Sequence, residues 1–285
     1  MKETLFLDRD VFEMDFIPEI FRFREAQVTK IVFAIQSGLQ GNSPVNLVIR
    51  GPPGTGKTTA VHKIFSDIRA SHEDIIPVYI NFHVEGSKFD VFARIFEELH
   101  NHKFPHKGQT IRQLVDDIGK TISESEAVLL VYFDDANNLL PGYTLNDILG
   151  VLLHLYKEHP KARVGFFLSI CNMNIDLKKV LDSGITSVFQ PDDVCFPAYK
   201  EEEVREILQD RIAAGLLPGV ISDEVFSFLM EHTMQCEDIR VGIAMVKRSV
   251  MVAEREGRSS ITKEDIMGSF EVSKSIGADR VGCES

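Results

Sequence analysis

A glycine-rich segment offers the clearest chemistry in this sequence. A glycine, four further residues and then Gly-Lys-Thr form the pattern of a loop that wraps phosphate groups. Glycines let successive backbone N–H groups turn toward one anion, and the dipole of a following helix favours negative charge there. Lys57 is predicted to place its charge on the β- and γ-phosphates of a nucleotide, and the Thr58 hydroxyl to ligate Mg²⁺. The segment consists of Gly51, Pro52, Pro53, Gly54, Thr55, Gly56, Lys57, Thr58 and Thr59.

Two carboxylates follow the most apolar stretch of the chain and could hold the metal of that nucleotide. Asp134 and Asp135 come directly after the run Ala127–Phe133. Ligands of α/β sheets bind at the carboxyl ends of the strands, so Asp134 is predicted to bind Mg²⁺ together with Thr58. Asp135 is the candidate for orienting or activating an attacking water. The alternatives are a glycine-rich turn and an acidic turn that bind nothing.

Short apolar runs alternate along the chain with segments whose apolar residues recur at helical spacing. These strands and helices would position the residues named above. The alternation predicts an α/β fold, with a five-stranded parallel sheet flanked by helices. The run Ala127–Phe133 is apolar throughout, as expected for a strand covered on both faces. The predicted strands are Asn46–Arg50, Ile75–Phe82, Ala127–Phe133, Arg163–Ile170 and Asp193–Phe196.

The pattern changes after Phe196, because the rest of the chain has helix-period apolar residues only. Ser222 is a predicted N-cap, and Thr262 with Asp265 three residues later is a predicted capping pair. We therefore expect a nucleotide-binding domain over residues 1–196 and a small all-helical domain over residues 197–285.

The overall charge limits the kinds of partner. The 285 residues include 31 Lys+Arg and 43 Asp+Glu, which gives a formal net charge of −12 and a pI near 5.2. Neutralisation of phosphates supplies much of the affinity of proteins for duplex DNA. The charge therefore argues against a wide DNA-binding face and leaves room for a small contact.

The cysteines and the N-terminus predict an intracellular protein. Cys171, Cys195, Cys236 and Cys283 are widely spaced without a C-x-x-C pair, which favours reduced thiols over disulfides or a zinc site. The segment Met1–Asp10 contains acids and no long apolar stretch, and no run reaches the about 18 apolar residues of a membrane span. We expect a soluble, cytoplasmic protein, or a nuclear one in a eukaryote, without a membrane partner.

Three histidines lie close together in the sequence and are conceivable metal ligands. They are His100, His102 and His106, and imidazole suits zinc and copper. No cysteine or acid completes a recognisable ligand spacing, so a solvated loop is favoured.

Several short segments between Val11 and Ile266 follow one another in the order of a known family. They are Ile17-Pro18-Glu19, Arg24-Glu25, Tyr79-Ile80-Asn81, Phe104-Pro105 with Gly108, Ser169-Ile170-Cys171-Asn172, Phe196-Pro197-Ala198-Tyr199 and Glu237-Asp238-Ile239-Arg240. With the phosphate loop, they resemble AAA+ ATPases, and among these the origin-recognition and cell-division-control replication initiators of archaea and eukaryotes. The phosphate loop by itself indicates only an AAA+ or related protein, and the ordered set points to initiators.

The resemblance implies an AAA+ fold, with a nucleotide-binding αβα domain and a helical lid, that binds ATP or ADP with Mg²⁺. It implies that Asn172 hydrogen-bonds the γ-phosphate or the attacking water, and that Arg240 reaches the γ-phosphate from the lid. It further implies that Tyr199 and Arg211 line the adenine and ribose side. By residue type alone, an Asn after a strand is usually a turn residue, and an Arg beside an apolar stripe is usually solvated.

Three features depart from the pattern of the family. Initiators usually have Glu where this chain has Asp135, whose carboxylate falls short by about 1.5 Å. A misplacement of about 1 Å can slow a reaction about 100-fold. Gly184 stands where the family has its arginine finger, a group worth about 10³–10⁵ in rate. We also expect the chain to lack the C-terminal winged-helix domain of initiators, because no such sequence follows the lid helices before Ser285.

We therefore expect a replication initiator that binds ATP, hydrolyses it slowly and uses its nucleotide state to close the lid. The expected partners are other AAA+ initiator subunits or a replicative helicase, with origin DNA bound weakly by this chain alone. Two alternatives stay open. One is a non-hydrolysing interaction module that keeps its nucleotide, and the other is a clamp-loader-like or other AAA+ remodeller.

Overall fold

The structure is a computed structural model that describes residues 4–105, 110–139 and 144–281. His106, Gly108 and Cys283, named above, lie outside the described residues. The chain divides into two compact units, each taken by itself below. The sheet unit consists of Arg24–Pro52 and Gly56–Pro197, and the helical unit of Met1–Phe23, Pro53–Thr55 and Ala198–Ser285.

The sheet unit is built around five parallel strands, as the alternating pattern predicted. Their order is β2-β3-β4-β1-β5, so the phosphate loop follows a strand with neighbours on both sides. All seven residues of β3 are buried, which explains why its sequence is apolar throughout. Every predicted strand is confirmed to within one residue at each end. The strands are β1 (Leu47–Arg50), β2 (Ile75–Asn81), β3 (Val128–Asp134), β4 (Arg163–Ile170) and β5 (Asp192–Cys195).

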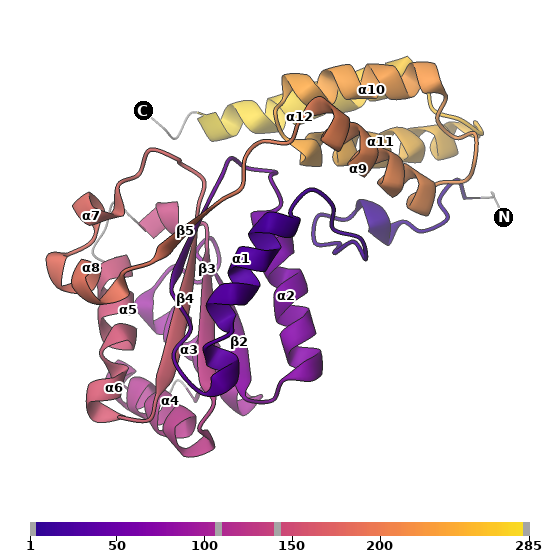
Figure 1. Ribbon diagram of the computed structural model, residues 1–285. Helices are drawn as coiled ribbons and strands as arrows, with labels where there is room; N and C mark the ends of the chain where they lie inside the picture. Colours follow the sequence, from indigo (N-terminus) through magenta and orange to yellow (C-terminus); the bar gives the residue numbers. More distant parts are fainter. Residues whose placement is uncertain (1–3, 106–109, 140–143, 282–285) are drawn as a thin grey trace. The chain divides into compact units, whose positions relative to one another are not determined.

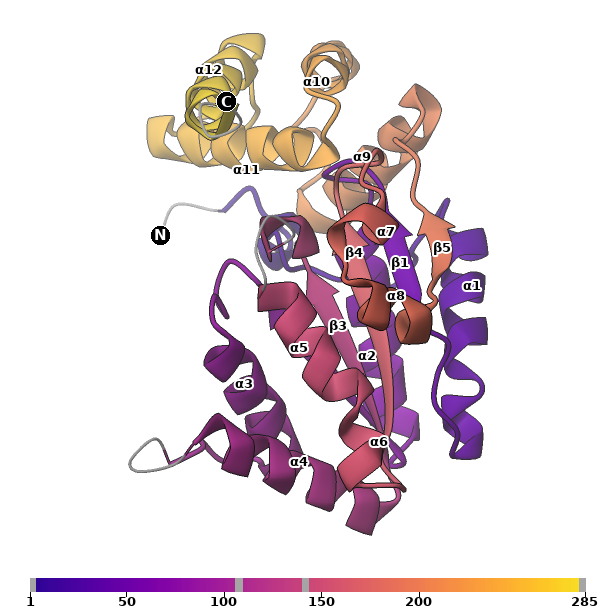
Figure 2. The same ribbon diagram turned by 90° about the vertical axis from the view of Figure 1, so that its left-hand side faces the viewer.

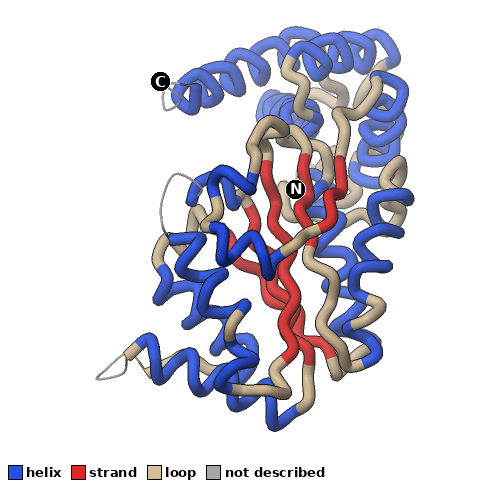
Figure 3. The backbone as a smooth tube through the Cα atoms, turned by 60° about the vertical axis from the view of Figure 1, so that its left-hand side comes forward, coloured by secondary structure: helices blue, strands red, loops and turns tan. Residues whose placement is uncertain are grey.

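Helices cover both faces of this sheet (Figures 1 and 2). On one face lie α1 (Glu25–Ile35) and α2 (Lys57–Ser71), and on the other α3 (Lys88–His100), α4 (Ile111–Ser125) and α5 (Thr144–Leu153). Figure 3 shows the red strands between these layers of helices. The large side chains of Phe133 and Phe166 are fully buried in this core. The short helices are η2 (Gly38–Gln40), η3 (Ala136–Leu139), α6 (Leu155–Glu158), α7 (Leu177–Val180) and α8 (Ser183–Phe189).

Two helices of the sheet unit begin with capping boxes. Ser87 and Asp90 cap α3 reciprocally, and Thr110 and Gln113 do the same for α4. Each box satisfies two backbone N–H groups that lack a partner within the helix, and such a cap is worth about 1 kcal/mol. The start of each helix is therefore fixed locally by its own sequence.

The helical unit confirms the change of pattern after Phe196. Ser222 caps α10 by accepting from the backbone N–H of Val225 at 3.3 Å. Thr262 and Asp265 cap α12 as a pair, as predicted. None of the helices in the described part of the chain is long and apolar enough to span a bilayer. The elements of this unit are η1 (Asp10–Phe12), α9 (Glu201–Gly215), α10 (Asp223–Gln235), α11 (Ile239–Glu256) and α12 (Lys263–Val281).

The N-terminal residues pack on the helices of this unit, an arrangement that no sequence pattern indicated. Phe6 forms an isolated antiparallel bridge with Leu216. Val11 and Phe12 are buried in the core between the helices. Gly215 permits this close approach, because a Cβ at that position would lie 2.3 Å from the Phe12 ring. The core of the helical unit is thus assembled from segments far apart in the sequence.

Candidate nucleotide-binding site

The glycine-rich loop connects the end of β1 to the start of α2. Helix α2 begins at Lys57, and Gly54 and Gly56 before it have φ angles of 73° and 88°. Glycine adopts such left-handed angles readily because it has no Cβ. Gly51 meets a different requirement, since a Cβ there would lie 2.2 Å from the carbonyl oxygen of Phe196. The result is a tight loop that ends at a helix N-terminus, an arrangement suited to phosphate.

The Lys57 side chain is buried and is held by the loop itself. Its Nζ donates hydrogen bonds to the carbonyl oxygens of Gly51 at 2.6 Å and Pro52 at 2.9 Å. A buried ammonium group is costly unless its protons are hydrogen-bonded, and these carbonyls satisfy that need. Nζ therefore lies at the loop, where phosphate oxygens could replace the carbonyls as acceptors.

Asp134 is buried at the end of β3 and accepts hydrogen bonds at both carboxylate oxygens. Oδ2 accepts from the hydroxyls of Thr58 at 2.9 Å and Tyr79 at 3.0 Å. Oδ1 accepts from the hydroxyl of Tyr132 at 2.9 Å and from the backbone N–H of Asp135 at 3.1 Å. The structure thus brings Thr58 and Asp134 together. Adjacent ligands in an octahedral Mg²⁺ shell with bonds of about 2.1 Å are about 3 Å apart, which is close to this spacing.

Tyr79 and Tyr132 are site residues that the sequence patterns did not reveal. They are paired in the register of β2 and β3, with ring centroids 5.8 Å apart. Burial and the Asp134 carboxylate raise the pKa of both hydroxyls well above the usual value, so both remain hydrogen-bond donors. One signal was available, because Tyr132 and Asp134 are two residues apart on one strand and so share a face.

Asp135 leaves the strand with a φ of 52° and has different neighbours. Its Oδ1 accepts from the Cys171 thiol at 3.5 Å, and its Oδ2 lies 3.4 Å from Nε2 of His83. Burial raises the pKa of the Cys171 thiol, which keeps the thiol neutral and able to donate. These contacts are longer than those of Asp134, and the Asp135 side chain is 32% exposed. No sequence pattern had indicated Cys171 or His83 as a neighbour of this carboxylate.

Asn172, the expected sensor, is exposed and closes a turn. Its Oδ1 accepts from the backbone N–H of Asn174 at 2.9 Å. Next to it, Oδ1 of Asn137 accepts from the backbone N–H of Cys171 at 3.2 Å. This geometry is that of a turn residue, and a role of Asn172 toward phosphate stays a prediction.

Three expected site residues belong to the helical unit and have partners within it. Arg240 pairs with Asp238, with Nη2–Oδ2 at 2.6 Å and Nε–Oδ1 at 2.9 Å. Arg211 donates to the carbonyl oxygen of Val11 at 2.6 Å, and burial lowers the pKa of its guanidinium. Tyr199 is partly buried against the core of this unit. Their roles toward a nucleotide stay predictions.

Gly184, at the place of the family's arginine finger, lies exposed in α8. No heavy atom lies within 4 Å of a Cβ added there. The position therefore has open space for a longer side chain.

The histidines near the end of α3 fit a packing role. His100 lies against Phe96 with ring centroids 4.1 Å apart, and its Nε2 is 3.3 Å from the Thr121 hydroxyl. Within the described residues, His100 and His102 belong to no group of three metal-ligating side chains.

Two family models match the chain. The model of an AAA domain matches residues 42–179, from just before β1 into α7. The model of a Cdc6 AAA+ ATPase-type lid domain matches residues 205–271, within α9 to α12.

Similar proteins and solved structures agree with these matches. ORC1-type DNA replication protein 2 of Methanosarcina mazei is 38% identical over 272 residues, which cover 95% of this chain and 72% of that protein. ORC1-type DNA replication protein 6 of Halobacterium salinarum is 34% identical over 278 residues, which cover 98% and 74%. The structure of the Aeropyrum pernix ORC1 protein in complex with DNA shares the fold, with a TM-score of 0.82 at 20% identity over 94% of this chain and 70% of that one. The chain therefore belongs to the ORC1-type DNA replication proteins, a family with the AAA+ fold.

Proposed function

We propose that this chain is an ATP-binding replication initiator that binds ATP or ADP with Mg²⁺ and hydrolyses ATP slowly. Its nucleotide state would control closure of the helical lid and assembly with partners at origins. The observation that carries the proposal is the contact between Thr58 and Asp134 at 2.9 Å, beside the phosphate loop that holds Lys57.

Thr58 and Asp134 would hold the magnesium ion. Oγ1 of Thr58 and Oδ2 of Asp134 are hard oxygen ligands at a suitable spacing, and the buried carboxylate supplies negative charge. A bound ion neutralises phosphate charge. The Thr58 hydroxyl would then direct its lone pair at the ion and give up its hydrogen bond to Asp134. Lys57 would exchange loop carbonyls for phosphate oxygens.

The proposal that hydrolysis is slow rests on the identity of Asp135. This carboxylate is the candidate for orienting the attacking water, and an aspartate reaches less far than a glutamate by about 1.5 Å. Its contacts with Cys171 at 3.5 Å and His83 at 3.4 Å are long and hold the carboxylate only loosely. The short reach of Asp135 also favours a second candidate function, a module that keeps its nucleotide without hydrolysing it. Turnover by the Asp135→Glu variant separates the two.

The helical unit would respond to the nucleotide through Arg240. Its guanidinium side chain is 44% exposed and bonded to Asp238. We propose that a γ-phosphate competes with this carboxylate for the guanidinium, which makes lid closure depend on the nucleotide. Tyr199 and Arg211 are proposed to line the adenine and ribose side, and Asn172 to face the γ-phosphate or the attacking water.

The partners are proposed from the relatives. Structures with the same fold include ORC1 of Aeropyrum pernix in complex with DNA and Drosophila ORC bound to DNA. We propose that this chain assembles with other AAA+ initiator subunits or a replicative helicase in the cytoplasm. We propose that this chain alone binds DNA weakly, because its net charge is −12, and that the affinity falls with salt according to the number of phosphates contacted. Family membership favours this function over the clamp-loader-like remodeller.

Removal of the loop lysine tests the binding proposal. Fluorescent ATP and ADP are titrated into the wild type, Lys57→Ala and Lys63→Ala, each with and without Mg²⁺. Charge-assisted hydrogen bonds contribute about 1.5–3 kcal/mol, so Lys57→Ala should weaken binding about 10- to 100-fold. Lys63→Ala, on the same helix outside the loop, should bind like the wild type. Equal affinity of the wild type and Lys57→Ala would contradict the proposal.

A further inference from the structure

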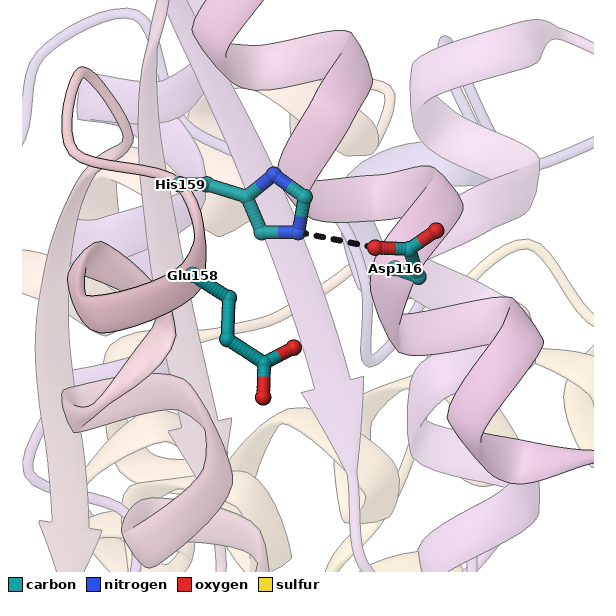
Figure 4. A group of neighbouring side chains, drawn as sticks. All are labelled: Asp116, Glu158 and His159. Carbon is teal, nitrogen blue, oxygen red and sulfur yellow. Dashed lines mark ion pairs between the residues drawn. The ribbon is translucent and has the colours of Figure 1, made fainter.

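Three metal-ligating side chains of the sheet unit gather away from the phosphate loop. Asp116 belongs to α4, Glu158 ends α6 and His159 follows it (Figure 4). His159 precedes the amino end of β4, whereas the phosphate loop follows the carboxyl end of β1, and these two strands are parallel neighbours. The group thus lies at the opposite end of the strands from the phosphate loop and has no part in the nucleotide site.

The imidazole of His159 is held firmly. It packs against α4 at Gly119, where an added Cβ would lie 2.2 Å from the imidazole Cδ2. The His159 side chain is 13% exposed. Its Nε2 is buried and lies 3.2 Å from Oδ1 of Asp116, an ion-pair contact drawn dashed in Figure 4 that does not have the geometry of a hydrogen bond. Buried polar atoms nearly always have a hydrogen-bond partner, so this nitrogen still has capacity for a ligand that it would share with Asp116.

The spacing of the group suits one small ion. Tetrahedral Zn²⁺ with bonds of about 2.0–2.2 Å places neighbouring ligand atoms about 3.3 Å apart. Nε2 of His159 and Oδ1 of Asp116 already have that separation, at 3.2 Å without the geometry of a hydrogen bond. The ligand atoms of all three residues lie within 4.8 Å of one another. Glu158 is exposed, so rotation of its side chain can close the remaining distance.

We propose that Asp116, Glu158 and His159 bind a divalent transition metal, with Zn²⁺ as the ion of choice. Imidazole and carboxylate suit zinc, whereas Mg²⁺ and Ca²⁺ take oxygen ligands. Two carboxylates and one neutral imidazole balance the charge of a divalent ion and leave a fourth position for water. The ion cross-links α4 to the segment before β4 and stabilises that end of the sheet unit.

Titration with Zn²⁺ alone tests the site. Calorimetry of the metal-free full chain should show one site, weakened about tenfold or more by Asp116→Asn, Glu158→Gln or His159→Gln. Asp117→Asn changes an exposed carboxylate on the same helix and should bind Zn²⁺ like the wild type. Because the Glu158 side chain is exposed, Glu158→Gln keeps the test valid if His159→Gln fails to fold. The proposal is overturned if the three ligand variants and Asp117→Asn bind Zn²⁺ alike, or if the wild type binds none.

The absorption spectrum of bound Co²⁺ identifies the type of ligand. Co²⁺ bound to imidazole and carboxylate gives visible d–d bands without an intense thiolate charge-transfer band in the near ultraviolet, and Zn²⁺ should displace it. Nucleotide affinity of Glu158→Gln should equal that of the wild type, since the group lies at the other end of the strands. A thiolate band that persists in the three variants would place the metal at the cysteines and overturn the proposal.

Discussion

The two carboxylates at the end of β3 differ sharply in how they are held. Asp134 is 5% exposed and accepts four hydrogen bonds of 2.9–3.1 Å. Asp135, the next residue, is 32% exposed in its side chain and has a thiol at 3.5 Å and an imidazole at 3.4 Å. The binding half of the site, around Asp134, is therefore rigid, and the hydrolysis half, around Asp135, is loosely organised.

The contrast explains why nucleotide binding and turnover are expected to differ in this chain. A ligand that finds its polar partners already in place binds without the cost of ordering them. Catalysis requires more, because small errors in the position of a catalytic group slow a reaction strongly. A firmly held candidate for metal binding beside a loosely held candidate for water activation fits a nucleotide switch better than a fast ATPase.

The largest effect is expected from a substitution of Asp134, in the binding half of the site. Asp134→Asn keeps the size of the side chain but removes the carboxylate charge that would bind Mg²⁺. Since interactions of a charged group are worth up to about 3 kcal/mol, the gain in ATP affinity from Mg²⁺ should fall by up to about 100-fold. Titrations of wild type and variant with ATP, with and without Mg²⁺, measure this gain. An unchanged Mg²⁺ effect would show that the ion binds elsewhere.

A longer carboxylate at position 135, in the hydrolysis half, should produce the next largest effect. Asp135→Glu extends the carboxylate by about 1.5 Å, and correct placement of a catalytic group is worth up to about 100-fold in rate. ATP turnover should rise while ATP affinity stays the same, as measured by phosphate release and by equilibrium binding. If turnover stays at zero in Asp135→Glu, the non-hydrolysing module is the better description.

The tyrosine hydroxyls should matter less, and mainly for stability. Tyr132→Phe leaves one Asp134 oxygen with one donor fewer and should lower the free energy of unfolding by about 1 kcal/mol. Tyr79→Phe should cost less, because Tyr79 is only partly buried. Chemical denaturation measures both, and a fully neutral Tyr132→Phe would show that Asp134 does not depend on this hydroxyl.

These hydroxyls also predict a pH dependence of stability. The pKa values of Tyr79 and Tyr132 are raised in the folded protein, so their contribution is fully present below the unfolded value of about 10. Above that pH the unfolded chain loses these protons while the folded protein keeps them, and stability falls. The slope of unfolding free energy against pH above about 10 should be shallower in Tyr132→Phe than in the wild type.

The smallest effect is expected from Cys171→Ala. The thiol is a weak donor, and its contact with Asp135 is 3.5 Å long. ATP affinity should therefore change by less than about threefold, which corresponds to under 1 kcal/mol. A large loss of ATP binding would assign Cys171 to the binding half and erase the contrast between the two halves.

The sequence predicted what depends on local pattern. The five strands follow from continuous apolar runs, the phosphate loop from its glycine spacing, and the caps at Ser222 and Thr262 from residue type. Tyr79, Cys171 and His83 were not predicted as neighbours of the two carboxylates, because β2 and β4 bring them in from distant parts of the chain. The packing of residues 4–23 on the helices of the helical unit was not predicted for the same reason. Phe12 and Gly215 are far apart in the sequence, and no local pattern indicates that they are in contact.

The fate of bound ATP tests the central claim most directly. The full chain is loaded with ATP and Mg²⁺, freed of unbound nucleotide, and the bound ATP and ADP are followed over time. The account predicts about one nucleotide per chain, still mostly ATP after many seconds without a partner, since typical enzymes turn over about 10 times per second. Conversion of the bound ATP to ADP within a second, or a chain that retains no nucleotide, would contradict it.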